Sequence, residues 1–302
     1  MLPFAFLFLL CFKEVVALKI CSFNVRSFGE AKIAKPEVLD VIVKVISRCD
    51  IMLLMEIKDS NNKVFPLLMN KINSQAEGTH VYSSIISKRL GRKTYKEQYA
   101  FIYREKVATV KQTYQYQDLQ PGDEDAFSRE PFVVWFKCPK TVVKEFVLIP
   151  QHTTPEAAVR EIDELYDVYL DVKQNWNTEN FIFLGDFNAD CGYVPKKQWK
   201  NIRLRAQEDF VWLIGDNNDT TVRDTTHCAY DRIVVHGEKL LRSIVPHSTA
   251  IFNFREAFGL SEEQALAVSD HFPVEVELKT TRGFLDWLKS LIPQKNKTKR
   301  AS

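Results

Sequence analysis

The chain has 302 residues and a formal net charge of +2, and 45% of its residues are hydrophobic. This length and composition allow one large domain with a sizeable core. A net charge this close to zero does not by itself indicate that the protein binds nucleic acid. The charge is uneven, however, because residues 281–302 carry +5 and the rest carries −3. A basic arm therefore follows a mildly acidic body.

Residues 1–17 contain an apolar block of about ten residues and end in the small residue Ala17. The block has the length of a secretory signal, and we expect cleavage after Ala17 and secretion through the endoplasmic reticulum, with a nuclear pool as a further destination. The usual basic start is missing, which leaves an uncleaved anchor as the alternative. No later apolar run is long enough to cross a bilayer. We therefore expect a signal peptide at 1–17, a catalytic domain at 18–280 and a tail at 281–302.

Predicted strands alternate with two long predicted helices along the chain. The helices span Pro36–Cys49, with a proline suited to the first turn, and Pro155–Trp176, which we expect Thr153 and Thr154 to cap. Apolar runs predict strands that end near Asn24, at Glu56 and at His152, a strand over 181–184 that Gly185 stops, and strands that begin around Asp231 and Asp270. This alternation predicts an α/β fold in which helices cover the sheets.

Polar residues stand at one end of each of these six strands. In FLGDFNAD, Asp186 and Asn188 follow a buried strand, and residues two apart in extended chain point to the same side. Asp, Asn and Gly are also ordinary turn residues, so this stretch alone fits a turn equally well. The repetition at six strand ends favours a polar, metal-binding pocket at one edge of a sheet.

Five cysteines remain after the predicted cleavage. Cys191 and Cys228 flank a loop-rich segment that a disulfide would stabilise, and Cys21 and Cys49 end neighbouring elements and could also pair. Cys138 would then be free. A zinc site is the alternative, but no Cys-x-x-Cys or paired Cys/His spacing is present.

The tail begins with an apolar stripe that contains Trp287 and ends at Pro293 before several lysines. This pattern predicts a short amphipathic helix that contacts anionic membranes or DNA. A solvated end that packs on the body is the alternative.

Eight stretches, in order, resemble the deoxyribonuclease I family of the endonuclease/exonuclease/phosphatase superfamily: KICSFNVRSFG, MEIKDS, LGRKTYKEQYAF, FSREPFVV, HTTPEAAVREID, GDFNADCGYVPKKQW, CAYDRIVV and SDHFPVE. The resemblance covers Leu18 to about Leu278. It implies a two-sheet sandwich flanked by helices, in four layers. The basic tail, and the lack of a small extra cysteine pair, place the chain in one branch of that family.

The resemblance implies two carboxylate–histidine pairs, in which Glu97 orients His152 and Asp231 orients His271. Such a carboxylate fixes the imidazole tautomer and stabilises the imidazolium, which suits acid–base chemistry near neutral pH. We expect His271 to act as base on water and His152 to protonate the leaving 3′ oxygen.

The same resemblance makes Glu56 the principal metal carboxylate. Asp186, Asn188, Asp270 and Asn24 complete the metal and phosphate site. A phosphodiester under attack gains negative charge that a hard divalent cation stabilises, and amide groups can donate to the same oxygens without repulsion. The implied cofactors are Mg²⁺ and Ca²⁺, with Mn²⁺ as a substitute.

DNA contacts are implied for Lys58, Tyr95, Arg129 and Tyr230. At position 58 this chain has lysine where deoxyribonuclease I has arginine, so the bidentate and stacked contacts of a guanidinium are lost while phosphate attraction remains.

Two structural calcium sites are implied, and the second is the weaker match because its loop carries an inserted residue. The first site involves Asp118, Asp125, Phe127 and Glu130; the second involves Asp219, Thr221 and Thr226. Two N-x-S/T sequons, at Asn218 and Asn296, are exposed to glycosylation if the chain is secreted.

Actin binding is not expected, although actin is a partner of deoxyribonuclease I. Ser84, Ile86 and Lys88 stand where that protein carries tyrosine, valine and glutamate contacts, so an aromatic anchor is lost and a charge is reversed.

The resemblance thus implies a monomeric, metal-dependent endonuclease that hydrolyses DNA, including chromatin DNA, to 5′-phosphate and 3′-hydroxyl ends. One alternative is a phosphoesterase of the same superfamily that acts on lipid or inositol phosphates. Another is a non-catalytic DNA- or membrane-binding protein, which predicts that catalytic positions are replaced, and none is.

Overall fold

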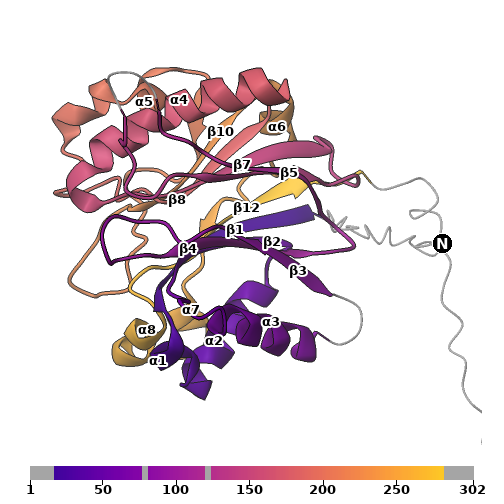
Figure 1. Ribbon diagram of the computed structural model, residues 1–302, viewed down its shortest axis with the longest axis vertical. Coiled ribbons are helices and arrows are strands. Elements are labelled where there is room, and N and C mark those ends of the chain that lie inside the picture. Colours follow the sequence, from indigo (N-terminus) through magenta and orange to yellow (C-terminus); the bar gives the residue numbers. More distant parts are fainter. Residues whose placement is uncertain (1–16, 77–80, 120–123, 282–302) are drawn as a thin grey trace, which may run out of the picture.

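The computed structural model describes residues 17–76, 81–119 and 124–281. Within these ranges two six-stranded sheets pack face to face, and helices cover their outer faces (Figure 1). The four-layer α/β sandwich predicted from the sequence is confirmed. The predictions for the signal peptide and for residues 282–302 lie outside the described residues, and no helix among those described is long and apolar enough to span a membrane.

The first sheet has the order β11-β12-β1-β2-β4-β3, in which only β1 and β2 are parallel neighbours. Its strands are β1 (Ala17–Phe28), β2 (Ile51–Ile57), β3 (Tyr82–Ile86), β4 (Gln98–Arg104), β11 (Ala250–Ile251) and β12 (Val274–Lys279). On its outer face lie α1 (Glu30–Ile33), α2 (Pro36–Ser47), α3 (Val64–Gln75), α7 (Phe254–Ala257) and α8 (Glu262–Val268).

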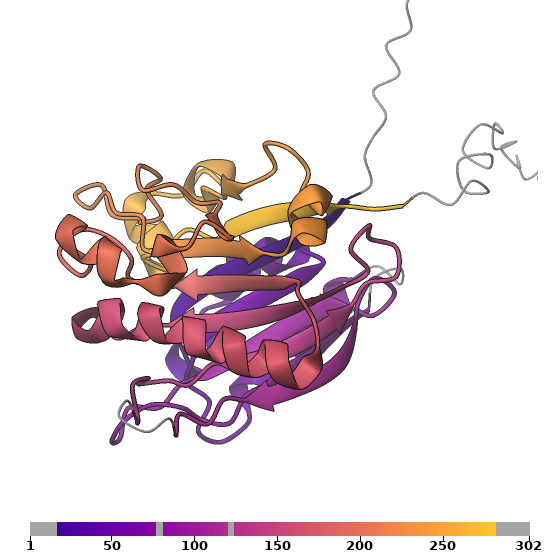
Figure 2. The ribbon, with the colours of Figure 1, turned by 90° about the horizontal axis from the view of Figure 1, so that it is seen from above.

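The second sheet has the order β5-β6-β7-β8-β10-β9, in which only β7 and β8 are parallel neighbours. Its strands are β5 (Thr109–Gln115), β6 (Phe132–Lys137), β7 (Glu145–His152), β8 (Phe181–Asp186), β9 (Phe210–Trp212) and β10 (Asp231–His236). The other helices are η1 (Pro155–Ala157), α4 (Ala158–Trp176), η2 (Lys196–Asn201), α5 (Arg203–Ala206) and α6 (Glu238–Ser243). The long α4 lies across the outer face of this sheet (Figure 2).

Three apolar clusters hold the layers together. The central cluster lies between the sheets and includes Phe101 and Phe136, whose rings meet edge to face. The outer clusters join α2, α3 and α8 to the first sheet and α4 to the second. Strands buried on both faces read as continuous apolar runs, which is why the sequence revealed them.

Two local predictions were wrong. Gly185 does not stop the strand, because β8 continues to Asp186 and Gly185 pairs with Gln151 and Arg232. Gly185 has φ +142, and a Cβ there would lie 2.0 Å from the Gln151 carbonyl oxygen, so only glycine lets the strands approach. The Thr154 side chain does not cap the helical segment. Thr153 Oγ1 donates instead to the Phe187 carbonyl.

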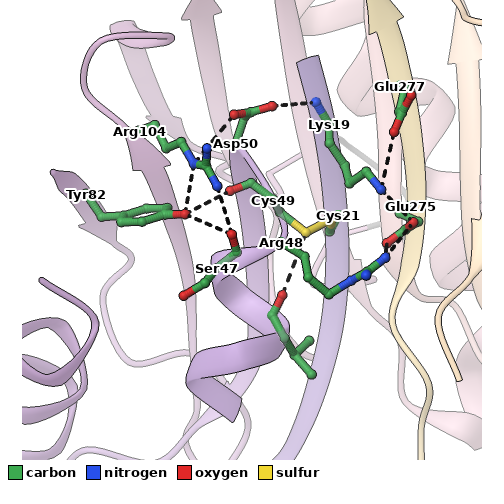
Figure 3. Close-up of a disulfide and its surroundings, with 11 residues drawn as sticks. Lys19, Cys21, Ser47, Arg48, Cys49, Asp50, Tyr82, Arg104, Glu275 and Glu277 are labelled. Atoms are coloured by element: carbon green, nitrogen blue, oxygen red, sulfur yellow. Dashed lines mark hydrogen bonds and ion pairs between the residues drawn. A yellow bond between two sulfur atoms is a disulfide. The ribbon is translucent and has the colours of Figure 1, made fainter. Parts of the chain in front are cut away.

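Both suggested cysteine pairs are disulfides in this structure, and Cys138 is buried and free. Cys21–Cys49 joins β1 to the short connection between α2 and β2. Figure 3 shows this disulfide beside buried Glu275, which pairs with Lys19 and Arg48. Cys191–Cys228 joins the loop after β8 to the chain just before β10.

Candidate active site

The site forms where strand ends from the two sheets meet. In the second sheet, Asp186 is in register with His152 on one neighbouring strand and with Asp231 on the other. From the first sheet, Asn24 on β1 reaches across, and its Nδ2 donates to Asp186 Oδ2 over 3.0 Å. One carboxylate therefore stands at the junction of the two sheets.

Both predicted carboxylate–histidine pairs are formed. His152 Nδ1 lies 2.5 Å from Glu97 Oε1, and His271 Nδ1 lies 2.7 Å from Asp231 Oδ2. The Nε2 atom of each imidazole lies 3.5 Å from Asp186 Oδ2. With each Nδ1 engaged by a carboxylate, the two Nε2 atoms converge on one point and are available for proton transfer.

Glu56, on β2, contacts the cluster of Asp186 and the two histidines through Asn24. Its Oε1 accepts from Asn24 Nδ2 at 3.1 Å, and its Oε2 accepts from the Ser27 N–H at 2.8 Å. Glu56, Arg26 and Ser27 all have positive φ angles, of 60°, 43° and 54°. The pairing of β1 with β2 and of β2 with β4 shifts register here. Such irregularities re-aim side chains, and strained residues of this kind cluster at functional sites.

The stretch after β8 is both a turn and part of the site. Asp186 Oδ1 accepts from the Asn188 N–H at 3.0 Å, which is the turn expected of an aspartate. Asn188 has φ 47°, so the argument that Asp186 and Asn188 point the same way in extended chain does not apply. Asn188 Nδ2 donates to the Thr153 carbonyl, and Asn24 Nδ2 bridges two carboxylates. In this structure both amide groups are thus held by protein acceptors.

Asp270 lies at the rim of the site. Its side chain is 35% exposed, and its Oδ2 lies 3.5 Å from Arg26 Nε. The more buried ligand set consists of Asp186, Asp231 and His271, which offer ligand atoms within 4.8 Å of one another.

The electrostatics of the site favour charged histidines. Burial alone would lower the pKa of His271, but the carboxylates of Asp231 and Asp186 raise it well above its usual value. The Glu97 carboxylate likewise raises the pKa of His152 in spite of burial. Burial would raise the pKa of Asp186, and the two histidines instead hold it below its usual value.

The donor set fits a hard divalent cation. Glu56 and Asp186 are carboxylates brought together around one amide, with Asp231 close by. Carboxylate and amide oxygens are the ligands that Mg²⁺ and Ca²⁺ prefer. Cys191 and Cys228, which lie near this edge, form a disulfide and therefore offer no thiolate to a softer metal.

Three of the residues predicted to contact DNA, Lys58, Tyr95 and Tyr230, flank the histidine pairs. Lys58 Nζ lies 4.3 Å from the centroid of the Tyr95 ring, and Tyr95 is 45% exposed. On the other side, the Tyr230 ring packs between the rings of Tyr193 and His271.

The fourth residue predicted to contact DNA, Arg129, has a buried side chain beside Glu97 and His152. Its side chain is 8% exposed; Nε donates to the His152 carbonyl at 2.8 Å and lies 3.3 Å from Glu97 Oε1. Arg129 thus supports the first carboxylate–histidine pair, and its contact with DNA stays a prediction.

Three residues of the first predicted calcium site, Asp118, Asp125 and Phe127, lie close together, and the structure shows the partners of their polar groups. Asp118 Oδ2 accepts from the Phe127 N–H, while the exposed Asp125 pairs with Arg92. The Arg92 guanidinium also contacts the carbonyls of Asp125 and Phe127, oxygens that a calcium ion would need. The Glu130 carbonyl accepts from Gln115. Among the described residues, which exclude 120–123, these acids form no ligand cluster.

The residues of the second predicted calcium site lie together in one loop and contact one another. Asp219 Oδ1 accepts from the N–H and hydroxyl of Thr221, and Oδ2 lies 2.9 Å from His227 Nδ1. The Thr226 carbonyl accepts from the Thr221 hydroxyl. These oxygens accept hydrogen bonds within their own loop in this structure, and the second calcium site stays a prediction.

Several supporting residues were missed from the sequence. Glu161 is fully buried on α4 and accepts from Gln151 and from the N–H groups of Ser128 and Thr154. It falls in the apolar stripe of that helix, three residues after Ala158 and four before Leu165, so an acid at a core position was an available signal. Ser269 gave no such signal, although its hydroxyl donates to the Asn24 carbonyl at 2.6 Å.

Known proteins resemble this chain along almost its whole length. Deoxyribonuclease gamma from Homo sapiens is 59% identical over 296 residues, which cover 98% of this chain and 97% of the relative. Deoxyribonuclease-1 from Sus scrofa is 49% identical over 265 residues, which cover 87% of this chain and 92% of the relative.

Solved structures show the same fold. A crystal structure of an endonuclease/exonuclease/phosphatase family protein from Bacteroides thetaiotaomicron has a TM-score of 0.54 at 18% identity, covering 88% of this chain and 99% of the other. The model of the endonuclease/exonuclease/phosphatase family matches residues 21–271, which span all the strand ends described above. Sequence, fold and the convergence of those strand ends agree, and the chain belongs to this family.

Proposed function

We propose that this protein is a divalent-metal-dependent endonuclease that hydrolyses DNA phosphodiesters to 5′-phosphate and 3′-hydroxyl ends. The convergence of two carboxylate-paired imidazoles on Asp186 carries the proposal, because hydrolysis requires one group to accept a proton and another to donate one. The names of the relatives, deoxyribonuclease gamma and deoxyribonuclease-1, support DNA as the substrate.

In this mechanism the neutral form of the His271 imidazole accepts the proton of the attacking water. The carboxylates of Asp231 and Asp186 raise the pKa of His271, which makes its imidazole a stronger proton acceptor. His152, held by Glu97, donates a proton to the leaving 3′ oxygen. Glu97 and Asp231 hold the tautomers throughout.

Glu56 and Asp186, with Asp231 nearby, would hold the cation. Bound there, it would stabilise the charge that develops on the phosphate oxygens. Lys58, Tyr95 and Tyr230 provide positive charge and aromatic surface on both sides of the cleavage point, which suits a nucleic-acid strand.

Further parts of the proposal rest on the sequence pattern. We infer that the protein is a secreted monomer that cleaves chromatin as well as naked DNA, with Mg²⁺ and Ca²⁺ as the cations and Mn²⁺ as a substitute. The basic tail is proposed to contact anionic membrane surfaces or chromatin, and a nuclear pool is a further expectation. Asn218 is exposed and accepts from the Gly215 N–H through its side chain, and Asn296 lies outside the described residues.

Plasmid nicking tests the proposal. The protein is incubated with supercoiled plasmid, Ca²⁺ and Mg²⁺, with and without a chelator, and Glu56→Gln serves as a site variant. Nicking that disappears with chelator and in the variant is expected. Persistent cleavage in chelator would refute the metal dependence, while no cleavage of DNA together with hydrolysis of a lipid or inositol phosphate would favour the other phosphoesterase function.

A further inference from the structure

Lys32 is a partly buried lysine on α1, directly after the strained turn at Arg26 and Ser27. Its Nζ donates to three backbone carbonyls: Val25 at 2.8 Å, Arg26 at 2.5 Å and Val268 at 2.7 Å. An ammonium group has three donors and no acceptor, so this geometry uses its full hydrogen-bonding capacity. A lysine with all its donors on backbone carbonyls holds chain segments rather than reaching for a ligand.

The carbonyls of Val25 and Arg26 belong to the end of β1, the segment that positions Asn24 and Glu56. Val25 follows Asn24, which bridges Glu56 and Asp186. The turn at Arg26 and Ser27 places the Ser27 N–H on Glu56 Oε2. Two successive residues in the left-handed region need outside support, because that conformation is unfavourable for non-glycine residues.

The third carbonyl, that of Val268, belongs to the segment that leads into His271. Val268 is the last residue of α8, where helix carbonyls lack partners within the helix. The next residue, Ser269, donates through its hydroxyl to the Asn24 carbonyl and accepts from the His271 N–H. Lys32 therefore joins two segments that lie 236 positions apart in the chain, on either side of the cluster.

We propose that Lys32 is a positioning residue for DNA hydrolysis at this site, fixing the Asn24–Glu56 side relative to His271 through its three carbonyl contacts. The inference rests on the proposed function. Lys32 acts through the backbone of Val25, Arg26 and Val268, so its loss should reduce the chemical step more than DNA binding.

The charges around Lys32 are mixed. Burial and then the charge of Arg26 lower the pKa of Lys32 to about 8, while Glu56 and Asp270 oppose the shift and Lys35 adds to it. Near neutral pH the group still carries its third proton. Deprotonation would leave two donors for three carbonyls.

The test compares Lys32→Met with Lys35→Met. Lys35 is exposed and three residues away, at the N-cap of α2, so both variants remove one positive charge from neighbouring positions while only Lys32→Met removes the carbonyl contacts. Lys32→Met is expected to lower kcat on plasmid DNA about 100-fold, as for a misplacement of about 1 Å, with KM changed less than about threefold. Lys35→Met should leave kcat unchanged. An unaltered kcat, or a rise in KM alone, in Lys32→Met would overturn the proposal.

A rescue experiment separates positioning from stability. In Lys32→Ala, methylammonium can donate to the vacated carbonyls, whereas tetramethylammonium carries the same charge without a donor. Partial recovery of kcat with methylammonium alone is expected. Equal recovery with both ions, or with neither, would count against Lys32 as a carbonyl-bound positioning group.

Folding and the proposed function are tested in parallel. If Lys32→Met is poorly folded by circular dichroism, Lys32→Arg replaces it, and full kcat in that variant would refute the need for three converging donors. Amide exchange at Ser27 and His271 is a readout independent of cleavage and should accelerate at least tenfold in Lys32→Met. Failure of the wild type to cleave DNA would refute the function, whereas unchanged exchange would refute the positioning.

Discussion

Asn24 Nδ2 donates to Asp186 Oδ2 over 3.0 Å, although 162 positions separate the two residues in the chain. The bond crosses from the first sheet to the second and is buried. Its acceptor oxygen is also the atom that both imidazole Nε2 groups face. The site therefore depends on the packing of the two sheets, and the following predictions test its parts.

The two imidazoles should each be essential. His152→Ala and His271→Ala are expected to reduce kcat by about 10²- to 10⁴-fold, the usual contribution of a general acid or base, while circular dichroism remains that of the wild type. The double variant should lose much less than the product of the single losses, because both groups act in one step. Near-normal turnover in either single variant would remove that histidine from the mechanism.

Activity should fall as the pH rises through about 8, where Lys32 loses its proton. In Lys32→Arg the guanidinium stays charged, so this alkaline decline should be missing even if kcat is lower throughout. In the unfolded chain the lysine keeps its proton up to about 10.5, so above pH 8 this group's contribution to the free energy of unfolding rises with pH. Loss of kcat without a parallel loss of Tm is the expected pattern, and an identical alkaline decline in both proteins would contradict it.

The two disulfides should differ in what they support. Replacing both cysteines of either pair by serine should lower the free energy of unfolding by about 3–4 kcal/mol, since the bonds close loops of 28 and 37 residues. Loss of Cys191–Cys228 should also lower kcat, because Ala229, beside Cys228, donates to Asp190 Oδ2 and leads into Tyr230 and Asp231. Urea titration and nicking assays measure the two effects. An unchanged kcat without Cys191–Cys228 would show that the loop holds its shape alone.

Monomeric actin should not inhibit this enzyme. Ser84 and Ile86 lie on β3, the edge strand of the first sheet, and Lys88 follows it with an exposed side chain. These positions present no aromatic anchor and a reversed charge, so binding should be severely weakened. A nicking assay titrated with actin provides the measurement, with an actin-sensitive deoxyribonuclease-1 as positive control. Full inhibition at equimolar actin would mean that other residues supply the contact.

The tail should contribute to the cleavage of chromatin and lipid-bound DNA but not to the cleavage of naked DNA. A protein that ends at Lys279 is expected to nick naked plasmid almost normally, because the residues of the site all lie earlier in the chain. It should lose activity on chromatin or lipid-bound DNA, and the loss should shrink as added salt screens the basic residues. Equal loss on naked DNA would assign the tail a role in folding, consistent with the bond from the Thr281 N–H to the Lys140 carbonyl.

The alternation of apolar runs with amphipathic helices predicted the layers of this fold from the sequence, because burial on both faces of a strand leaves an uninterrupted apolar run. The helix predicted at Pro36–Cys49 is observed at Pro36–Ser47, because its apolar residues recur at helical spacing and are buried. Asn24, Glu56 and His152 were found at strand ends, and the resemblance to a family assigned their partners.

Tertiary structure alone decided how those residues are held. The sequence predicts that Gly185 ends its strand, but it lies within β8, where the close approach of the Gln151 backbone requires glycine. The resemblance makes Arg129 a DNA contact, and the structure adds that its buried side chain pairs with Glu97. The resemblance makes Asp219 a cation ligand, and the structure adds that its oxygens contact Thr221 and His227. The ammonium of Lys32 meets a carbonyl 236 positions away. Local sequence determines which surfaces a segment must bury, whereas the partner of a polar atom depends on which distant segment packing brings within about 3 Å of it.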